Sequence, residues 1–364
     1  MQAGKCTALV ISGGGSKGAF AVGVIANLHE RFGDTGWFSI VGGSSAGALV
    51  APFAALLGAD ARTASRAKET MVSVATRVST SDILERRGPL GLLRRRDALN
   101  ETEPLRRLLD RSLLPEWFAW LQTGSAPIVY AVYTNFRTGE KVTVTARDRG
   151  MDRHRFIDAL VASASVPVYM EPAMIDGDAC FDGGVRDLLP CEPAMGFGAE
   201  SILPIMLDPV APPRSVAPLG RLDRVLARTI AILLHETGLN DLERAESFAA
   251  AGRVREELLA AFAEDPSALR RLERVFEEPA NRGLFGRGNR LVTVVTGLRP
   301  DAPLTYDVLS FVPALMREWM AAGERKADEI IERSPFGVSD PTVAAEPGRE
   351  GGRPLAAEPM AAAA

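Results

Sequence analysis

The chain has 364 residues, of which 46% are hydrophobic and 24% are charged, and its net charge of -4 gives no overall attraction to nucleic acid. Its three cysteines, at positions 6, 180 and 191, lack metal-type spacing, so we expect free thiols and a reducing, cytoplasmic compartment. The N-terminus lacks the apolar core of a signal peptide and no window approaches the roughly 18 apolar residues of a membrane span, so we expect any membrane contact to be peripheral.

The first predicted unit, residues 7–32, is a buried strand, a glycine loop and a helix. The loop sequence Gly-Gly-Gly-Ser-Lys-Gly also fits the dinucleotide pattern G-x-G-x-x-G, but the acidic residue that such sites need after the next strand is missing. A glycine loop at a helix N-terminus stabilises negative charge through its amides. We therefore expect an oxyanion hole here, formed by Gly13, Gly14, Gly15, Lys17 and Gly18.

Residues 40–52 predict a strand, a sharp turn and a helix. Within them Gly43-Ser44-Ser45-Ala46-Gly47 matches G-x-S-x-G, in which Gly43 and Gly47 allow the tight turn and Ser45 is presented as a nucleophile. Centring the pattern on Ser44 would place Ala46 where the second glycine belongs. The alternative is an ordinary strand-to-helix turn.

A helix is predicted over 61–77, followed by an irregular segment, 79–100. In this segment five arginines surround the apolar run 88–93: Arg86, Arg87, Arg94, Arg95 and Arg96. A basic cluster with an apolar run can lie on an anionic membrane, so the segment Arg86–Arg96 is a candidate peripheral membrane contact; a solvated loop is the alternative. Helices at 104–111 and 115–122 and a hairpin of strands at 128–135 and 141–145 follow.

A helix is predicted over 152–163, and two short strands around a glycine turn then end at Asp182. Asp182 is followed by Gly183 and Gly184, a sequence that by itself usually marks a turn. Beyond it we predict strands at 201–207 and 291–296, and helices at 221–237, 241–262, 266–277 and 311–331. Residues 337–364 are rich in proline, glycine, alanine and glutamate, which predicts a disordered tail.

The glycine loop, the Ser45 elbow and the Asp182 turn occur in this order, with Ala162-Ser163-Ala164-Ser165-Val166-Pro167 between the last two. This set resembles the patatin-like phospholipase family, with its G-G-G-x-[K/R]-G loop, G-x-S-x-G elbow, A-S-x-x-x-P stretch and D-G-[G/A] turn. The resemblance implies that Ser45 is the nucleophile, that Asp182 is its partner in a Ser-Asp dyad, and that Lys17 takes the family's basic position. It also implies that lipid acyl esters are hydrolysed without a metal or other cofactor.

We expect an α/β fold of three layers, with helices on both faces of a mostly parallel sheet. One acyl hydrolase domain would span 5–335, with the motifs in 5–210 and a helical C-terminal part in 220–335. The chain departs from the family after Gly184, where it lacks the asparagine that many members carry before the proline. This departure leaves the surroundings of Asp182, and hence the substrate, open.

Two other functions fit parts of the sequence. A Ser-His-Asp triad could use Ser45, Asp182 and His235, whose chain order suits an α/β-hydrolase. However, His235 lies within the continuous helical pattern 230–236, whereas a triad histidine usually comes from a loop. The second alternative is a lipid- or nucleotide-binding module without catalysis, against which the presence of both Ser45 and Asp182 counts.

Overall fold

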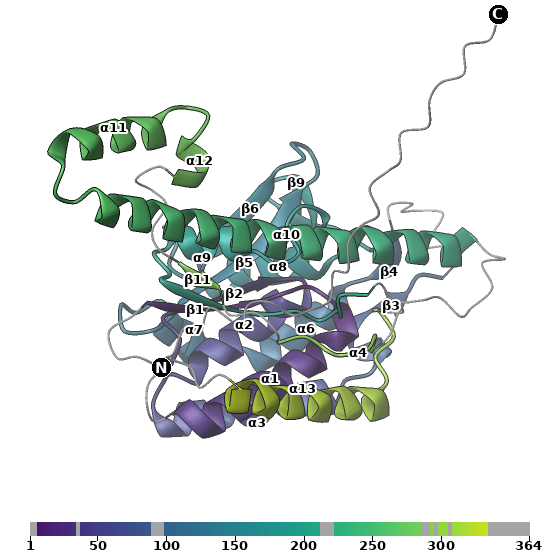
Figure 1. The fold of residues 1–364 in the computed structure, drawn as a ribbon. Helices are drawn as coiled ribbons and strands as arrows, with labels where there is room; N and C mark the ends of the chain where they lie inside the picture. The colour runs from purple at the N-terminus through teal and green to yellow at the C-terminus, as the bar shows by residue number, and fades with distance from the viewer. Residues whose placement is uncertain are drawn as a thin grey trace, which may run out of the picture.

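The computed structural model describes residues 6–33, 37–88, 98–211, 222–285, 292–294, 298–304 and 308–333 (Figure 1). Its main sheet has the strand order β11-β10-β1-β2-β5-β9-β8, with β6 also paired to β5. From β11 to β5 the neighbouring strands are parallel, and β6, β8 and β9 are antiparallel to their partners. The strand bounds are β1 Thr7–Ile11, β2 Ile40–Ser44, β5 Ile128–Asn135, β6 Lys141–Thr145, β8 Ala173–Ile175, β9 Asp178–Asp182, β10 Ser201–Ile205 and β11 Thr293–Val294.

Successive strand residues enter two separate cores, because side chains alternate across a sheet. Leu9 and Ile11 of β1 face one core, and Ala8 and Val10 face the other. The first core is built with α1 (Gly18–Phe32), α2 (Ala46–Leu56), α3 (Ala61–Arg77), α8 (Arg153–Ala164) and α13 (Pro313–Arg333). The second is built with α9 (Cys191–Gly196) and α10 (Leu222–Ala261), on the opposite side of the sheet in Figure 1. The three-layer α/β/α architecture expected from the sequence is confirmed.

Most predicted helices are present within one or two residues, among them α3 and the helices α6 (Glu103–Ser112), α7 (Pro115–Leu121) and α11 (Pro266–Glu277). Short helices α4 (Thr80–Ile83) and α12 (Arg282–Phe285) are additional. The prediction of separate helices at 221–237 and 241–262 is wrong, because α10 runs through both. Gly238, which lies between the two predicted helices, packs closely on Leu188: a Cβ at this position would lie 3.0 Å from Leu188 Cδ2. Glycine weakens a helix by about 1 kcal/mol relative to alanine, but at this position it lets Leu188 approach the helix backbone closely.

A second, three-stranded sheet was not anticipated. It joins β3 (Glu85–Arg86), β4 (Ala98–Glu101) and β7 (Val168–Met170). Beside it the Arg87 side chain is buried, where it donates to the Ala98 carbonyl and pairs with Glu171. Arg87 therefore does not belong to a surface basic cluster, whereas Arg86 is exposed. Arg94, Arg95 and Arg96 lie outside the described residues.

The C-terminal helix α13 packs directly on α1. A Cβ at Gly23 would lie 1.9 Å from the Met320 carbonyl oxygen, and one at Gly323 would lie 2.1 Å from that of Phe20. The two glycines therefore let the helix backbones touch, which joins the last described helix to the first. The predicted tail at 337–364 lies outside the described residues. Among the residues that are described, no helix is long and apolar enough to cross a membrane.

Candidate active site

Ser45 sits in the turn between β2 and α2 with φ 52° and ψ -125°. A non-glycine residue at positive φ is uncommon and stores strain, which typically occurs where a side chain is held for function. The flanking glycines are required by close approach, since a Cβ at Gly43 or Gly47 would lie 2.4 or 2.1 Å from the Ile11 carbonyl oxygen. The elbow is thus closed tightly against β1, and Ser45 is 5% exposed.

Ser45 and Asp182 meet at one edge of β5. On this edge β2 ends at Ser44 opposite Val132, and the antiparallel strand β9 ends at Asp182 opposite the next residue, Tyr133. The strand β6 occupies the other edge, because it pairs with the same β5 residues as β2 and β9 do. Strands β2 and β9 run toward this point from opposite directions and both end here, so Ser45 and Asp182, 137 positions apart in the sequence, become neighbours.

The carboxyl group of Asp182 is buried and only partly hydrogen-bonded. Its Oδ1 accepts the Gly184 amide at 2.7 Å, whereas Oδ2 has no hydrogen-bond partner among the described residues. Burial raises the pKa of Asp182 to about 6, against the lowering effects of the Ser45 hydroxyl and the Gly184 amide. The Ser45 hydroxyl therefore lies close enough to the Asp182 carboxylate to lower its pKa, although it makes no hydrogen bond of ordinary geometry with Oδ2. Such bonds are often long before substrate binds.

The turn after Asp182, the short helix η3 (Gly183–Val185), depends on its glycines. A Cβ at Gly183 would lie 2.2 Å from the Val132 carbonyl oxygen and 2.5 Å from Ser44 Oγ. One at Gly184 would lie 3.0 Å from both Asp182 Oδ1 and Leu234 Cδ2 of α10. The predicted acid turn is therefore packed between β5 and α10.

The glycine loop lies beside the serine, since a Cβ at Gly13 would be 3.0 Å from Ser45 Cβ. The Gly13 amide donates to the Leu188 carbonyl at 3.0 Å, so it is already engaged. No described residue accepts the amides of Gly14 and Gly15. The amides of Gly14 and Gly15 are therefore available to a hydrogen-bond acceptor.

The rest of the loop has structural contacts. Gly15 has φ 57°, and a Cβ there would lie 2.0 Å from the Val308 carbonyl oxygen, so glycine is required. The amide of Gly18 donates within η1 (Gly15–Lys17). Lys17 is buried, and its ammonium lies 2.6 and 2.7 Å from the carboxylate oxygens of Asp208. The side chain of Lys17 is thus committed to an ion pair.

His235 is not hydrogen-bonded into a triad. It lies on α10 and is 3% exposed, and neither ring nitrogen has a hydrogen-bond partner among the residues that the structure describes. A triad histidine needs the aspartate on one nitrogen and the serine on the other. The structure therefore brings Ser45 and Asp182 together without a histidine between them.

Two residues of the site had no assigned role in the sequence. The hydroxyl of Ser163, within the A-S-x-x-x-P stretch, accepts the Ser45 amide at 2.9 Å. Asp241 of α10 accepts the amides of Leu188 and Leu189 at 2.7 and 3.1 Å. An acidic residue in an amphipathic helix resembles an ordinary solvated position, so the sequence carried no signal for Asp241.

The comparison with protein-family profiles agrees with the motifs. The profile of the family described as patatin-like phospholipase matches residues 9–195, which include the glycine loop, the elbow and the acid turn. No curated protein matches the chain. Among solved structures, VipD from Legionella pneumophila is similar with 14% identity and a TM-score of 0.43, over 90% of this chain and 67% of that one. Because the profile covers more than half of its length, the chain belongs to the patatin-like phospholipase family, a family of lipid acyl hydrolases.

Proposed function

We propose that this protein is a serine acyl hydrolase that cleaves lipid and phospholipid acyl esters with Ser45 as nucleophile and Asp182 as base. Family membership supports the substrate class. The observation that carries the dyad is the buried Asp182 carboxylate, which has a free Oδ2 and a pKa of about 6 and lies next to a strained serine elbow. An ordinary aspartate, with a pKa near 3.9, would be a much weaker base.

In the proposed reaction, Asp182 takes the proton of the Ser45 hydroxyl as Oγ attacks the ester carbonyl carbon. The amides of Gly14 and Gly15 stabilise the oxyanion, and each such donor typically lowers the barrier by about 2.7–4 kcal/mol. The alcohol leaves with the proton from Asp182, and Ser45 is left acylated. Water then attacks the acyl-enzyme with Asp182 again as base, which releases the fatty acid and restores the serine.

Labelling with a fluorophosphonate probe, followed by peptide mapping, tests the nucleophile. We expect the label on Ser45, its loss in Ser45→Ala, and its retention in Ser44→Ala, which tests the other register of the motif. The same variants are then assayed on phospholipid vesicles. A folded protein that never labels would instead support the non-catalytic binding module.

We also propose a peripheral membrane contact for a cytoplasmic enzyme through the basic segment 86–96, without Arg87. Each basic residue near an anionic leaflet contributes about 1 kcal/mol, and salt screens this attraction. The exposure of Arg86 supports the proposal. Binding to vesicles that contain anionic lipid, measured at low and high salt, tests it.

A further inference from the structure

The C-terminal turn of α8 contacts the backbone of both proposed catalytic residues. The Ser45 amide donates to Ser163 Oγ at 2.9 Å. The Asp182 amide donates to the Ser165 carbonyl at 2.8 Å. Ser163 and Ser165 are both fully buried. One helix end therefore contributes to the placement of nucleophile and base together.

The Ser163 hydroxyl also bridges a gap in the sheet. It donates to the Val132 carbonyl at 2.6 Å while it accepts the Ser45 amide. Val132 is the last β5 residue paired with β2, and the next residue pairs with Asp182. The hydroxyl thus joins the two strands at the point where β2 leaves the edge of β5. Alanine at this position would leave a buried amide and a buried carbonyl without partners.

We infer that Ser163 is a positioning residue that fixes the direction of the Ser45 nucleophile. The direction of Oγ follows from the backbone of Ser45, which is held at a φ of 52°. A strained conformation of this kind persists only where the surroundings determine it, and the bond from the Ser45 amide to Ser163 does so. The same bond takes the Ser45 amide out of the oxyanion hole, which leaves that role to the glycine loop. The inference rests on the function proposed above.

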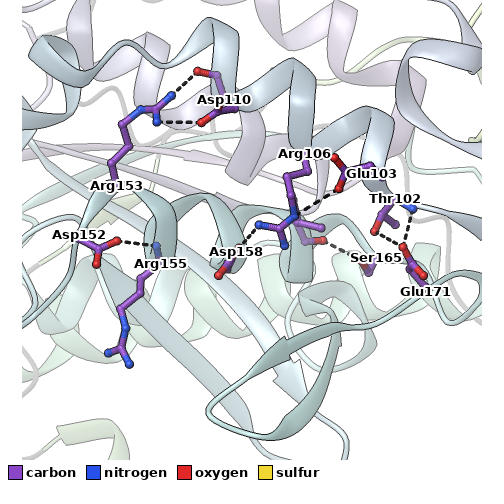
Figure 2. A network of polar contacts seen from close by, with 11 residues as sticks. Thr102, Glu103, Arg106, Asp110, Asp152, Arg153, Arg155, Asp158, Ser165 and Glu171 are labelled. Atoms are coloured by element: carbon purple, nitrogen blue, oxygen red, sulfur yellow. Dashed lines mark hydrogen bonds and ion pairs between the residues drawn. The ribbon is translucent and has the colours of Figure 1, made fainter.

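The helix that carries Ser163 is anchored through its N-terminal half. Figure 2 shows α8 joined to α6 by charged pairs, Arg106 with Asp158 and Arg153 with Asp110. The Asp152 side chain caps its first turn by accepting the Arg155 amide at 2.9 Å. Because α8 is held at several points, it will not shift to replace the lost contact when the Ser163 hydroxyl is removed.

Ser163→Ala tests the inference, with Ser165→Ala as the comparison. Both substitutions remove a buried hydroxyl from the same helix end, but among the residues described the Ser165 hydroxyl bonds only to the Val161 carbonyl of α8 itself. We measure kcat and KM on a soluble p-nitrophenyl ester and the rate of fluorophosphonate labelling at Ser45, each per folded molecule. We expect Ser163→Ala to lower kcat and labelling about 10²-fold, with KM little changed. Ser163→Thr, which keeps the hydroxyl, should recover most of the loss.

The outcomes are separable. If Ser163→Ala and Ser165→Ala label at the same rate per folded molecule, Ser163 only contributes to stability and the inference is overturned. If Ser163→Ala does not fold, Ser163→Cys carries the test, because the thiol fills the space but bonds weakly; a wild-type labelling rate would overturn the inference. If Ser45→Ala is still active, the proposed function fails first, whatever the Ser163 variants do.

Discussion

Lys17 and Asp208 form an ion pair inside the protein, with the ammonium 2.6 and 2.7 Å from the two carboxylate oxygens. Lys17 lies in the glycine loop and Asp208 follows β10, so the pair ties the loop to the neighbouring strand. The basic residue of the motif therefore supports the loop and does not offer its charge to a substrate. The ion pair with Asp208 therefore gives the basic residue of the motif a structural role.

Lys17→Met should strongly destabilise the protein, because it leaves the Asp208 carboxylate buried and unpaired. Breaking a buried pair in this way typically costs about 3–5 kcal/mol. Lys68→Met is the control, since it breaks the more exposed pair of Lys68 with Glu30, for which about 1 kcal/mol or less is expected. Urea denaturation measures both. Similar losses of unfolding free energy in the two variants would show that the buried Lys17–Asp208 pair contributes no more to stability than an exposed pair.

Asp182→Asn and His235→Ala separate the dyad from the triad. Asparagine keeps the size of the side chain but cannot accept the Ser45 proton, so acyl transfer should fall by about 10²–10⁴-fold or more. His235→Ala should leave the rate per folded molecule within a few fold. The comparison is made at matched folded fraction, because the buried His235 ring packs in the core. A well-folded His235→Ala protein that neither hydrolyses esters nor labels would rule out the dyad.

The activity should depend on pH through Asp182, whose pKa burial raises to about 6. The base must be unprotonated, so kcat/KM should be level above pH 7 and fall about tenfold per pH unit below 6. The profile is measured with a soluble ester in wild type and in His235→Ala. The same inflection in both is expected, and its disappearance in His235→Ala would assign the titration to the histidine.

Asp182→Asn should also stabilise the protein at neutral pH. Since the folded pKa lies above the unfolded value, the folded state binds the proton more tightly, and stability is lost as the pH rises from about 4 to 6. Above that range the buried charge costs up to about 3 kcal/mol, which asparagine removes. Thermal denaturation at pH 7.5 and at pH 4 checks this. A gain in Tm that is equal at both values would contradict the charge explanation.

Substitution of Arg87 should affect stability, whereas substitution of Arg94, Arg95 and Arg96 should affect membrane binding. Arg87→Gln should cost about 1–3 kcal/mol of stability, because it leaves the partly buried Glu171 without its guanidinium partner. It should leave vesicle binding unchanged. Replacing Arg94, Arg95 and Arg96 with glutamine should weaken vesicle binding at low salt and spare hydrolysis of a soluble ester. A loss of vesicle binding in Arg87→Gln equal to that of the triple variant would contradict this division.

Much of the site could be predicted from the sequence because its parts are local. The strand, glycine loop and helix at 7–32 and the strand, turn and helix at 40–56 are each formed by consecutive residues whose spacing and glycine content suit one backbone path. A G-x-S-x-G turn restricts its own backbone, so the strained Ser45 conformation is implicit in five residues. The three-layer fold follows from apolar strands that alternate with amphipathic helices.

The contacts between these parts were decided only by the tertiary structure. Arg87 belonged by sequence to a basic cluster, and its burial depends on Glu171. Gly238 lies inside the continuous helix α10, where it packs against Leu188. The hydrogen bonds of Ser163 to Ser45 and Val132 form at the point where β2 and β9 both end along the edge of β5. A sequence pattern reports preferences over a few neighbouring residues, whereas burial, pKa and hydrogen-bond partners depend on which distant segments pack together, and that is set by the whole chain.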